Sequence, residues 1–192
     1  IFSSMLEFEM SIKMWDLKYY IPELSYTTVV DVNAVKAGQT IELQDYCEIR
    51  DELRITKGIH LKIKNAVVNL SGPIVVDGGE IEISNSEFHY KKGDMPALIM
   101  IHSYASVRIM ESQFYCGHKC GGVRQSNGNL KLKFCTFCDI NNESAVTFFG
   151  NELEVSDCRF TDCYVLRAGA GISAQAGIAH IASCHFEECY AE

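Results

Sequence analysis

The sequence has no hydrophobic run long enough to cross a lipid bilayer. Its apolar stretches are short pieces such as Ala97 to Ile101, whereas a membrane-spanning helix needs about 20 apolar residues. Basic residues are also scarce: 17 Lys and Arg stand against 25 Asp and Glu, for a formal net charge of -8. Because affinity for nucleic acids depends on a basic surface, we expect neither a membrane nor a nucleic acid as partner.

A secretion signal is missing as well, since no basic segment followed by an apolar segment stands near the N-terminus. The chain also begins at Ile1 and not at a methionine. We therefore expect it to be a piece of a longer polypeptide.

Cysteine is the residue in clear excess. The chain has 192 residues, 47% of them hydrophobic, which is enough for one domain with a sizeable core. Nine cysteines in a chain of this size indicate an oxidised framework, a metal site or a cysteine-rich core.

One eight-residue pattern recurs along most of the chain: aliphatic, any, aliphatic, any, any, small, any, large apolar. Its six copies end at Val68, Phe88, Phe114, Phe137, Phe160 and Phe186. The successive spacings are 20, 26, 23, 23 and 26 residues. A period of this length predicts a solenoid of stacked repeats.

Two solenoid classes share this period, and the residues around the core distinguish them. A leucine-rich repeat has another leucine three residues before this core, where the chain has Gly78, Tyr104, Asn127, Gly150 and Ala176. It also needs a helical segment after the core, whereas residues 145–150 and 169–174 are rich in glycine and β-branched residues. We therefore interpret each period as strand, turn, strand, turn without a helix, as in one coil of a parallel β-helix.

From about residue 38 to 192, the repeats resemble those of right-handed parallel β-helices of the pectate-lyase-like class. Residues 37–43 and 53–63 resemble the usual opening coils of that class. The resemblance implies an all-β, single-stranded, right-handed parallel β-helix solenoid of about six to seven coils. It does not imply one activity, because the class includes lyases, hydrolases, epimerases, adhesins and plain binding scaffolds.

Coils stacked about 4.8 Å apart bring equivalent residues into ladders along the solenoid axis. We expect an internal stack of Phe88, Phe114, Phe137, Phe160 and Phe186 beside a column of small residues: Ser86, Ser112, Cys135, Cys158 and Cys184. The outward positions form a ladder of Lys62, Glu82, Arg108, Lys131, Glu154 and His180. Its signs alternate at most steps, which predicts a solvated, register-fixing face and not a substrate groove.

Their place in the repeat accounts for most of the cysteines. In-register cysteines on adjacent coils have parallel Cα–Cβ bonds, so a disulfide between them would be strained. We therefore interpret the column cysteines as reduced small hydrophobes, and Cys163 and Cys189 as a further column. Free thiols in this number indicate a reducing compartment, and we expect the protein to be cytoplasmic.

One cysteine group lies outside these columns. Cys116, His118 and Cys120 follow a stacked Phe, and Cys138 comes one coil later, so the four side chains are candidate zinc ligands. Zinc motifs normally combine two closely spaced pairs of Cys or His ligands, however, and here the second pair is reduced to a single residue. We expect a structural turn that contains thiols, without a bound cofactor, and keep zinc as the alternative.

The catalytic motifs of the class are missing. We find neither the aspartate cluster and arginine base of pectate lyases nor the paired aspartates, Gly-His-Gly and Arg-x-Lys of polygalacturonase-type hydrolases. Asp77, Glu80 and Asp94 are more simply interpreted as turn residues. The histidines that we considered, His102, His118, His180 and His185, have no Ser or Asp at a triad spacing.

The first 37 residues do not follow the repeat. Leu6, Met10 and Met14 fit one face of a helix, but they also fit an alternating strand, so residues 1–37 are interpreted as an N-terminal cap or a linker. The chain stops at Glu192, six residues after the last repeated Phe. From this we expect either a solenoid truncated at the C-terminus or end-to-end self-association.

Taken together, these patterns favour a non-catalytic binding or scaffold module of a larger protein, which presents a rigid β-helix surface to a protein or a glycan. The alternatives are a carbohydrate-active enzyme of the lyase or hydrolase type, with catalytic residues in an unrecognised arrangement, and an extracellular adhesin.

Overall fold

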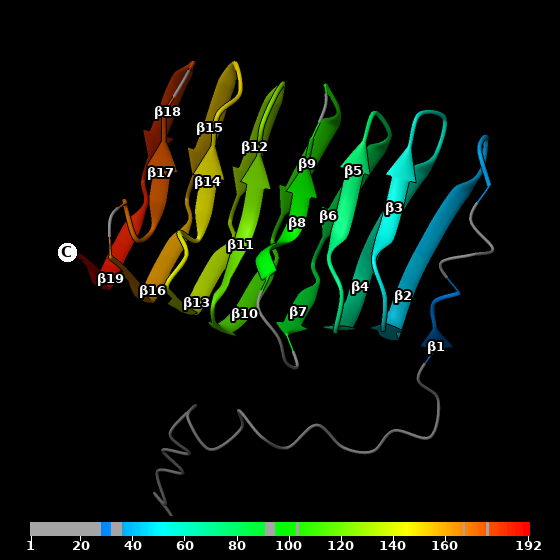
Figure 1. Ribbon diagram of the computed structural model, residues 1–192, viewed down its shortest axis with the longest axis horizontal. Helices are drawn as coiled ribbons and strands as arrows, with labels where there is room; N and C mark the ends of the chain where they lie inside the picture. Colours follow the sequence, from blue (N-terminus) through cyan, green and yellow to red (C-terminus); the bar gives the residue numbers. More distant parts are fainter. Residues whose placement is uncertain (1–27, 32–35, 91–94, 103, 167, 176) are drawn as a thin grey trace, which may run out of the picture.

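The computed structural model describes residues 28–31, 36–90, 95–102, 104–166, 168–175 and 177–192. Every regular element in these residues is a β-strand, and the coils are stacked along the longest axis of the molecule (Figure 1). No helix in this part of the chain has the length and apolarity needed to span a bilayer. The predicted right-handed parallel β-helix is confirmed, and it has seven coils.

Each coil contributes strands to three parallel rows. The first row is β2 (Thr40–Ile49), β4 (His60–Leu70), β6 (Glu80–Ser84), β9 (Ser106–Met110), β12 (Asn129–Lys133), β15 (Glu152–Ser156) and β18 (Ile178–Ala182). The second is β7 (Glu87–Tyr90), β10 (Gln113–His118), β13 (Thr136–Asn141), β16 (Arg159–Val165) and β19 (His185–Ala191). The third is β3 (Leu53–Thr56), β5 (Ile74–Asp77), β8 (Met95–Ile101), β11 (Cys120–Gln125), β14 (Val146–Phe148) and β17 (Ile172–Ala174).

The long strand β4 pairs with both β6 and β7, which joins the first two rows into one 13-stranded sheet. The third row is a separate six-stranded sheet. A short strand, β1 (Thr28–Val29), pairs in parallel with β2, so the larger sheet also includes residues upstream of residue 38. Of the predicted N-terminal cap, residues 1–27 and 32–35 lie outside the described residues.

In five of its six copies the eight-residue pattern spans two strands, and the first copy lies within the long strand β4, which corrects the simple strand, turn, strand, turn interpretation. In each of the second to seventh coils, one residue between the first and second rows has a left-handed backbone, with φ between 46° and 55°. We call these residues the corner column: Asn65, Asn85, Glu111, Phe134, Asp157 and Ser183. Since none of them is a glycine, the sequence carried no strong signal for the bend.

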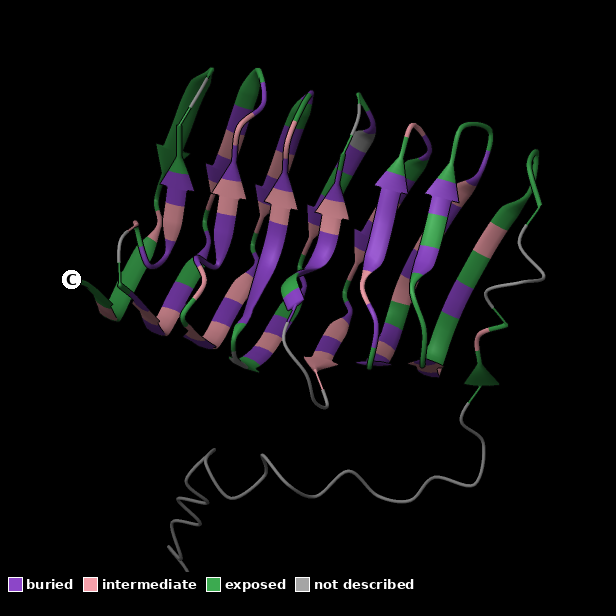
Figure 2. Ribbon diagram, in the orientation of Figure 1, coloured by how far each residue is buried: buried purple, intermediate pink, exposed green. Residues whose placement is uncertain are grey.

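The predicted phenylalanine stack fills the interior. Ring centroids from Phe88 to Phe186 are 4.8–5.2 Å apart, and neighbouring planes differ by no more than 8°. All of these rings are buried except Phe186, as Figure 2 shows for the interior faces of the strands. Glycine gives the stack room: a Cβ on Gly122 would lie 2.6 Å from the Phe137 ring.

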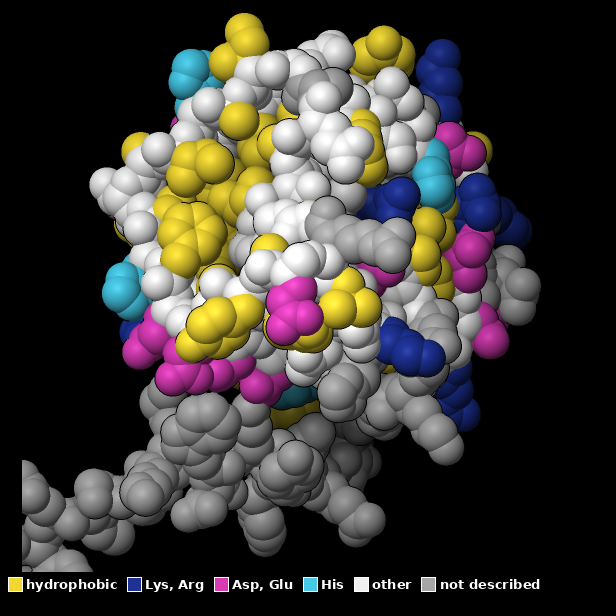
Figure 3. All heavy atoms as spheres, turned by 60° about the vertical axis from the view of Figure 1, so that its left-hand side comes forward, with side chains coloured by type: hydrophobic (Ala, Val, Ile, Leu, Met, Phe, Trp, Pro, Cys, Tyr) yellow, Lys and Arg dark blue, Asp and Glu magenta, His cyan; other side chains and the backbone are white. Residues whose placement is uncertain are grey.

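The last coil exposes apolar side chains. Ile178, Ile181, Phe186 and Tyr190 of β18 and β19 are all exposed, and Figure 3 shows hydrophobic side chains gathered on this end of the solenoid. At the other end, the inward side chains Leu43, Cys47 and Ile49 of β2 are buried.

Candidate functional site

The outer face of β9, β12 and β15 forms a shallow groove of about 570 Å³, which we call the side groove. Because side chains alternate along a strand, the outward residues of these strands form its floor. Residues of the turns before β9 and β15 also line it. The lining residues with polar or aromatic side chains are Tyr104, Arg108, Asn129, Lys131, Asn151, Glu152 and Glu154.

Charges on the floor of the side groove are only partly paired. Lys131 is in register with Glu154, and its Nζ lies 2.7 Å from a carboxylate oxygen of Glu154. On the other side, Lys131 is in register with Arg108, so two cations occupy adjacent rungs. Arg108 is exposed and forms no ion pair with another described residue. The predicted charge ladder is present in register, but this stretch of it is also a groove.

Tyr104 stands at the rim of the side groove with 75% of its surface exposed. A tyrosine ring offers an apolar face together with a polar hydroxyl, which suits a ligand with both kinds of surface. Tyr104 was not predicted from the sequence as a site residue, because there it only helped to exclude leucine-rich repeats. Its position just before a strand of the repeat was the available signal, because turn residues often carry function.

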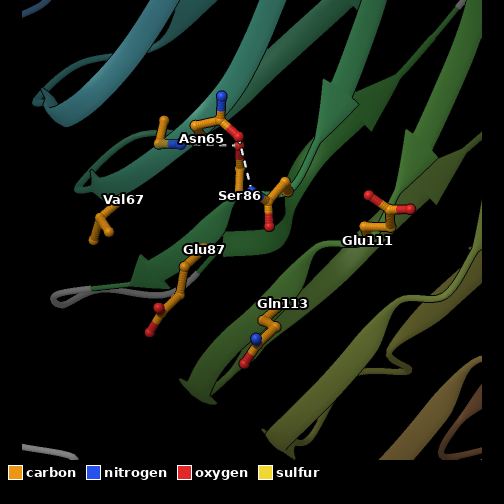
Figure 4. Close-up of a pocket in the computed structure, with 8 residues that line it drawn as sticks. Asn65, Val67, Ser86, Glu87, Glu111 and Gln113 are labelled. Atoms are coloured by element: carbon orange, nitrogen blue, oxygen red, sulfur yellow. Dashed lines mark hydrogen bonds between the residues drawn. The ribbon is translucent and has the colours of Figure 1, made fainter.

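A second hollow lies at the bend between the first two rows and has a volume of about 260 Å³ (Figure 4). We call it the corner cavity, and it is lined by Asn65, Ala66, Val67, Asn85, Ser86, Glu87, Glu111 and Gln113. Asn85 Nδ2 donates a hydrogen bond of 2.8 Å to Asn65 Oδ1, which ties two coils together. The carboxylates of Glu87 and Glu111 come from neighbouring coils and give the cavity an acidic wall.

A polar cluster continues from the corner cavity along β7 and β10. His89 Nε2 lies 2.6 Å from Glu87 Oε1, and this hydrogen bond lowers the pKa of Glu87. Tyr115 stacks on His89 at 4.9 Å and donates a hydrogen bond of 2.7 Å to Gln113 Oε1. Burial, with the nearby charge of Glu87, raises the pKa of Tyr115 to about 12, so its hydroxyl stays a donor at neutral pH.

The candidate zinc ligands are only partly brought together. Cys116 and Cys120 are buried neighbours, and burial with their shared hydrogen bond raises the pKa of Cys116 well above its ordinary value. Cys138 is half-buried on the outer face of β13, in register with Tyr115. The His118 side chain lies outside what the structure describes. Among the described residues, no group of three or more His, Cys, Asp or Glu is arranged to hold a metal ion.

The other candidates from the sequence are dispersed. Asp77 ends β5 and Glu80 begins β6, on either side of a turn with Gly78 at φ 83°. Asp94 lies outside the described residues. His180 is in register with Glu154 at the far end of the first row, and His185 Nε2 lies 3.7 Å from Glu187. These residues do not form one site.

Comparison with known families gives one match, to a family described as the right-handed β-helix region, over residues 28–191. The matched range includes every strand of the structure. No curated protein and no solved structure matches the chain.

Proposed function

The chain belongs to the right-handed β-helix family, and on that basis we propose that it is a non-catalytic binding module whose side groove takes an extended glycan. The fold alone does not identify a ligand, because solenoids of this kind present rigid surfaces for many purposes. The support comes from the groove, and above all from the exposed ring of Tyr104 beside planar polar side chains.

The lining of the side groove matches the chemistry of a sugar. An exposed tyrosine ring can pack on the apolar face of a sugar ring while its hydroxyl stays in water. The amides of Asn129 and Asn151 and the guanidinium of Arg108 offer hydrogen bonds to hydroxyl groups. Arg108 and Asn129 stand on neighbouring strands held in fixed register, and Asn151 directly precedes the next strand, so a ligand would have to order little of the backbone that carries them.

The pairing of Glu154 favours binding over catalysis. Glycoside hydrolysis uses two carboxyl groups, one as an acid and the other as a base or nucleophile. In the side groove, the carboxylate of Glu154 is ion-paired with Lys131 at 2.7 Å. Glu152 therefore has no unpaired carboxylate beside it on the outward face of β15 that could act as the second catalytic group.

A carbohydrate-active enzyme is the second candidate, and one observation favours it. Glu152 and Glu154 lie two residues apart on the outward face of β15, in a groove with an exposed aromatic residue. If substrate drew Lys131 away from Glu154, the groove would contain the pair of carboxyl groups that a hydrolase needs.

A glycan array with the purified chain, followed by calorimetry on the best oligosaccharide, tests the proposal. We expect Tyr104→Ala and Arg108→Ala to weaken binding at least about tenfold, the loss of one good contact. Tyr190→Ala removes another exposed tyrosine ring, outside the groove, and should leave affinity unchanged. Unchanged affinity in Tyr104→Ala would contradict the proposal, whereas turnover of the bound sugar that Glu152→Gln abolishes would favour the enzyme.

Location and self-association stay proposals. None of the nine cysteines is in a disulfide, which supports a reducing, cytoplasmic location over an extracellular adhesin, since an adhesin would have oxidised cysteines. The exposed Ile181 and Phe186 support pairing of two copies through their last coils, since the first coil has its inward side chains buried. Light scattering over a range of concentrations tests this, and a dimer that persists in Phe186→Ser would contradict it.

A further inference from the structure

Phe134 has a backbone conformation that suits its side chain badly. Twelve non-glycine residues among those described have a positive φ, and Phe134, at 54°, is the only hydrophobic one. Asn and Asp tolerate this left-handed conformation, whereas for a bulky side chain it is an outlier. The other members of the corner column are Asn, Glu, Asp and Ser, so an aromatic ring is not needed for the bend.

Burial of the Phe134 ring does not offset the free-energy cost of its left-handed backbone. The Phe134 side chain is 51% exposed, in contrast to the fully buried rings of the internal stack. The Lys133 ammonium lies 4.9 Å from the centroid of the ring, a contact that is worth about 0.5–1 kcal/mol at an exposed site. Strained residues that gain little from packing are found most often at functional sites.

Acidic side chains flank the ring on both sides. The backbone N–H of Glu111 donates to Lys133 O and that of Phe134 to Ser156 O, which places Glu111 one coil before Phe134 and Asp157 one coil after it. Glu111 and Asp157 are exposed, and neither forms an ion pair with another described residue. The exposed apolar ring therefore lies between two unneutralised carboxylates.

The corner cavity continues this surface, because Glu111 is part of its wall (Figure 4). Its volume of about 260 Å³ is below the usual range of small-molecule pockets, about 300–1,000 Å³. A cavity of this size suits a single side chain of a larger partner. With Glu87 and Glu111 on its wall, that side chain would be basic.

We propose that the corner cavity, Phe134 and Asp157 form a docking surface for an extended protein segment with basic side chains on both sides of an apolar one. Two coil spacings separate Glu111 from Asp157, about 10 Å, and residues i, i+2 and i+4 of an extended segment, whose side chains share one face, cover about 13 Å. The apolar side chain contacts Phe134, and the basic ones pair with the flanking carboxylates. The surface lies at the opposite end of β12 from the Asn129 side of the side groove, and it is independent of glycan binding.

A phage-displayed random peptide library, selected on the intact chain, tests the docking surface. We expect the selected peptides to combine basic and apolar residues. Phe134→Asn should weaken their binding at least about tenfold, and Glu111→Gln several-fold. Glu42→Gln removes the same charge from an exposed site on the first coil and serves as the matched control, with unchanged affinity.

Thermal unfolding of Phe134→Asn gives a second, independent result. If the ring is kept for binding at the expense of stability, the variant should unfold about 2–4 °C higher than the parent chain. A lower midpoint would show that Phe134 serves the fold and would overturn the proposal. Failure to select any peptide, or selected peptides that bind Phe134→Asn as well as the parent chain, would overturn it too.

Discussion

The Sγ atom of Cys158 accepts a hydrogen bond of 3.4 Å from the backbone N–H of Cys135, one coil earlier. The hydroxyl of Ser112 accepts the N–H of Ser86 in the same way, at 3.2 Å. Cys158 also donates to Ser156 O at 3.2 Å, just as Ser112 donates to Met110 O at 2.7 Å. The column of small residues is therefore a ladder of hydrogen bonds beside the corner column. Its cysteines donate and accept hydrogen bonds as well as filling space.

The ladder predicts that serine replaces cysteine better than alanine does. Cys158→Ala removes the acceptor and leaves the buried N–H of Cys135 unpaired, at a cost of about 1–3 kcal/mol. Cys158→Ser keeps both hydrogen bonds and should lose less. Urea unfolding under reducing conditions measures the difference, and equal losses in the two variants would show that the thiol only fills space.

The repeat made most of this fold predictable. Phe at the eighth place and a small residue at the sixth recur in five copies, and the structure stacks both sets in register. The bend at Glu111, Phe134 and Asp157 was not predictable, because these residue types differ and none is a usual sign of a left-handed backbone except Asp. A periodic pattern predicts only those positions at which similar residues recur. The bend falls on residues that differ from coil to coil, so it leaves no periodic signal in the sequence.

The candidate sites were largely hidden for the same reason. The side groove takes Tyr104 from a turn and its floor from three strands that are more than twenty residues apart in the sequence, so no local motif describes it. The cysteine and histidine motif, by contrast, was conspicuous in sequence, yet Cys138 faces outward while Cys116 is buried. Alternation along the strand separates residues that look adjacent in sequence.

The internal stack predicts that losing a middle ring destabilises the fold far more than losing the last ring. Phe137→Ala removes a fully buried ring and should cost about 3–5 kcal/mol. Phe186→Ala, at 47% exposure in the last coil, should cost well under half as much. Chemical denaturation of both variants provides the comparison, and similar losses would contradict the interpretation that the stack stabilises the fold through burial.

The arrangement of the thiols also predicts little zinc. Cys116 is buried with a raised pKa, and a thiol must lose its proton to bind zinc. We expect protein purified without added metal to contain less than about 0.1 equivalent of zinc by elemental analysis, because a structural site would be close to fully occupied. A value near one equivalent that falls in Cys120→Ser would reverse this prediction.

Buried thiols should make the protein lose stability in alkaline solution. Burial and the hydrogen bond with Cys120 raise the pKa of Cys116, and burial together with Cys189 raises that of Cys163. In the unfolded chain both thiols lose their protons near pH 8.5, whereas the folded chain keeps them. The folded state then binds more protons, so the free energy of unfolding is constant below about pH 8 and falls as the pH rises further.

Each such thiol contributes a slope of up to about 1.4 kcal/mol per pH unit once the unfolded chain is deprotonated. Urea unfolding between pH 7 and 9.5, in the presence of a reductant, measures this slope below the range in which tyrosines titrate. Cys163→Ser should flatten it even if the variant starts from a lower stability. A flat profile in the parent chain, or an unchanged slope in Cys163→Ser, would show that these thiols do not control the alkaline stability.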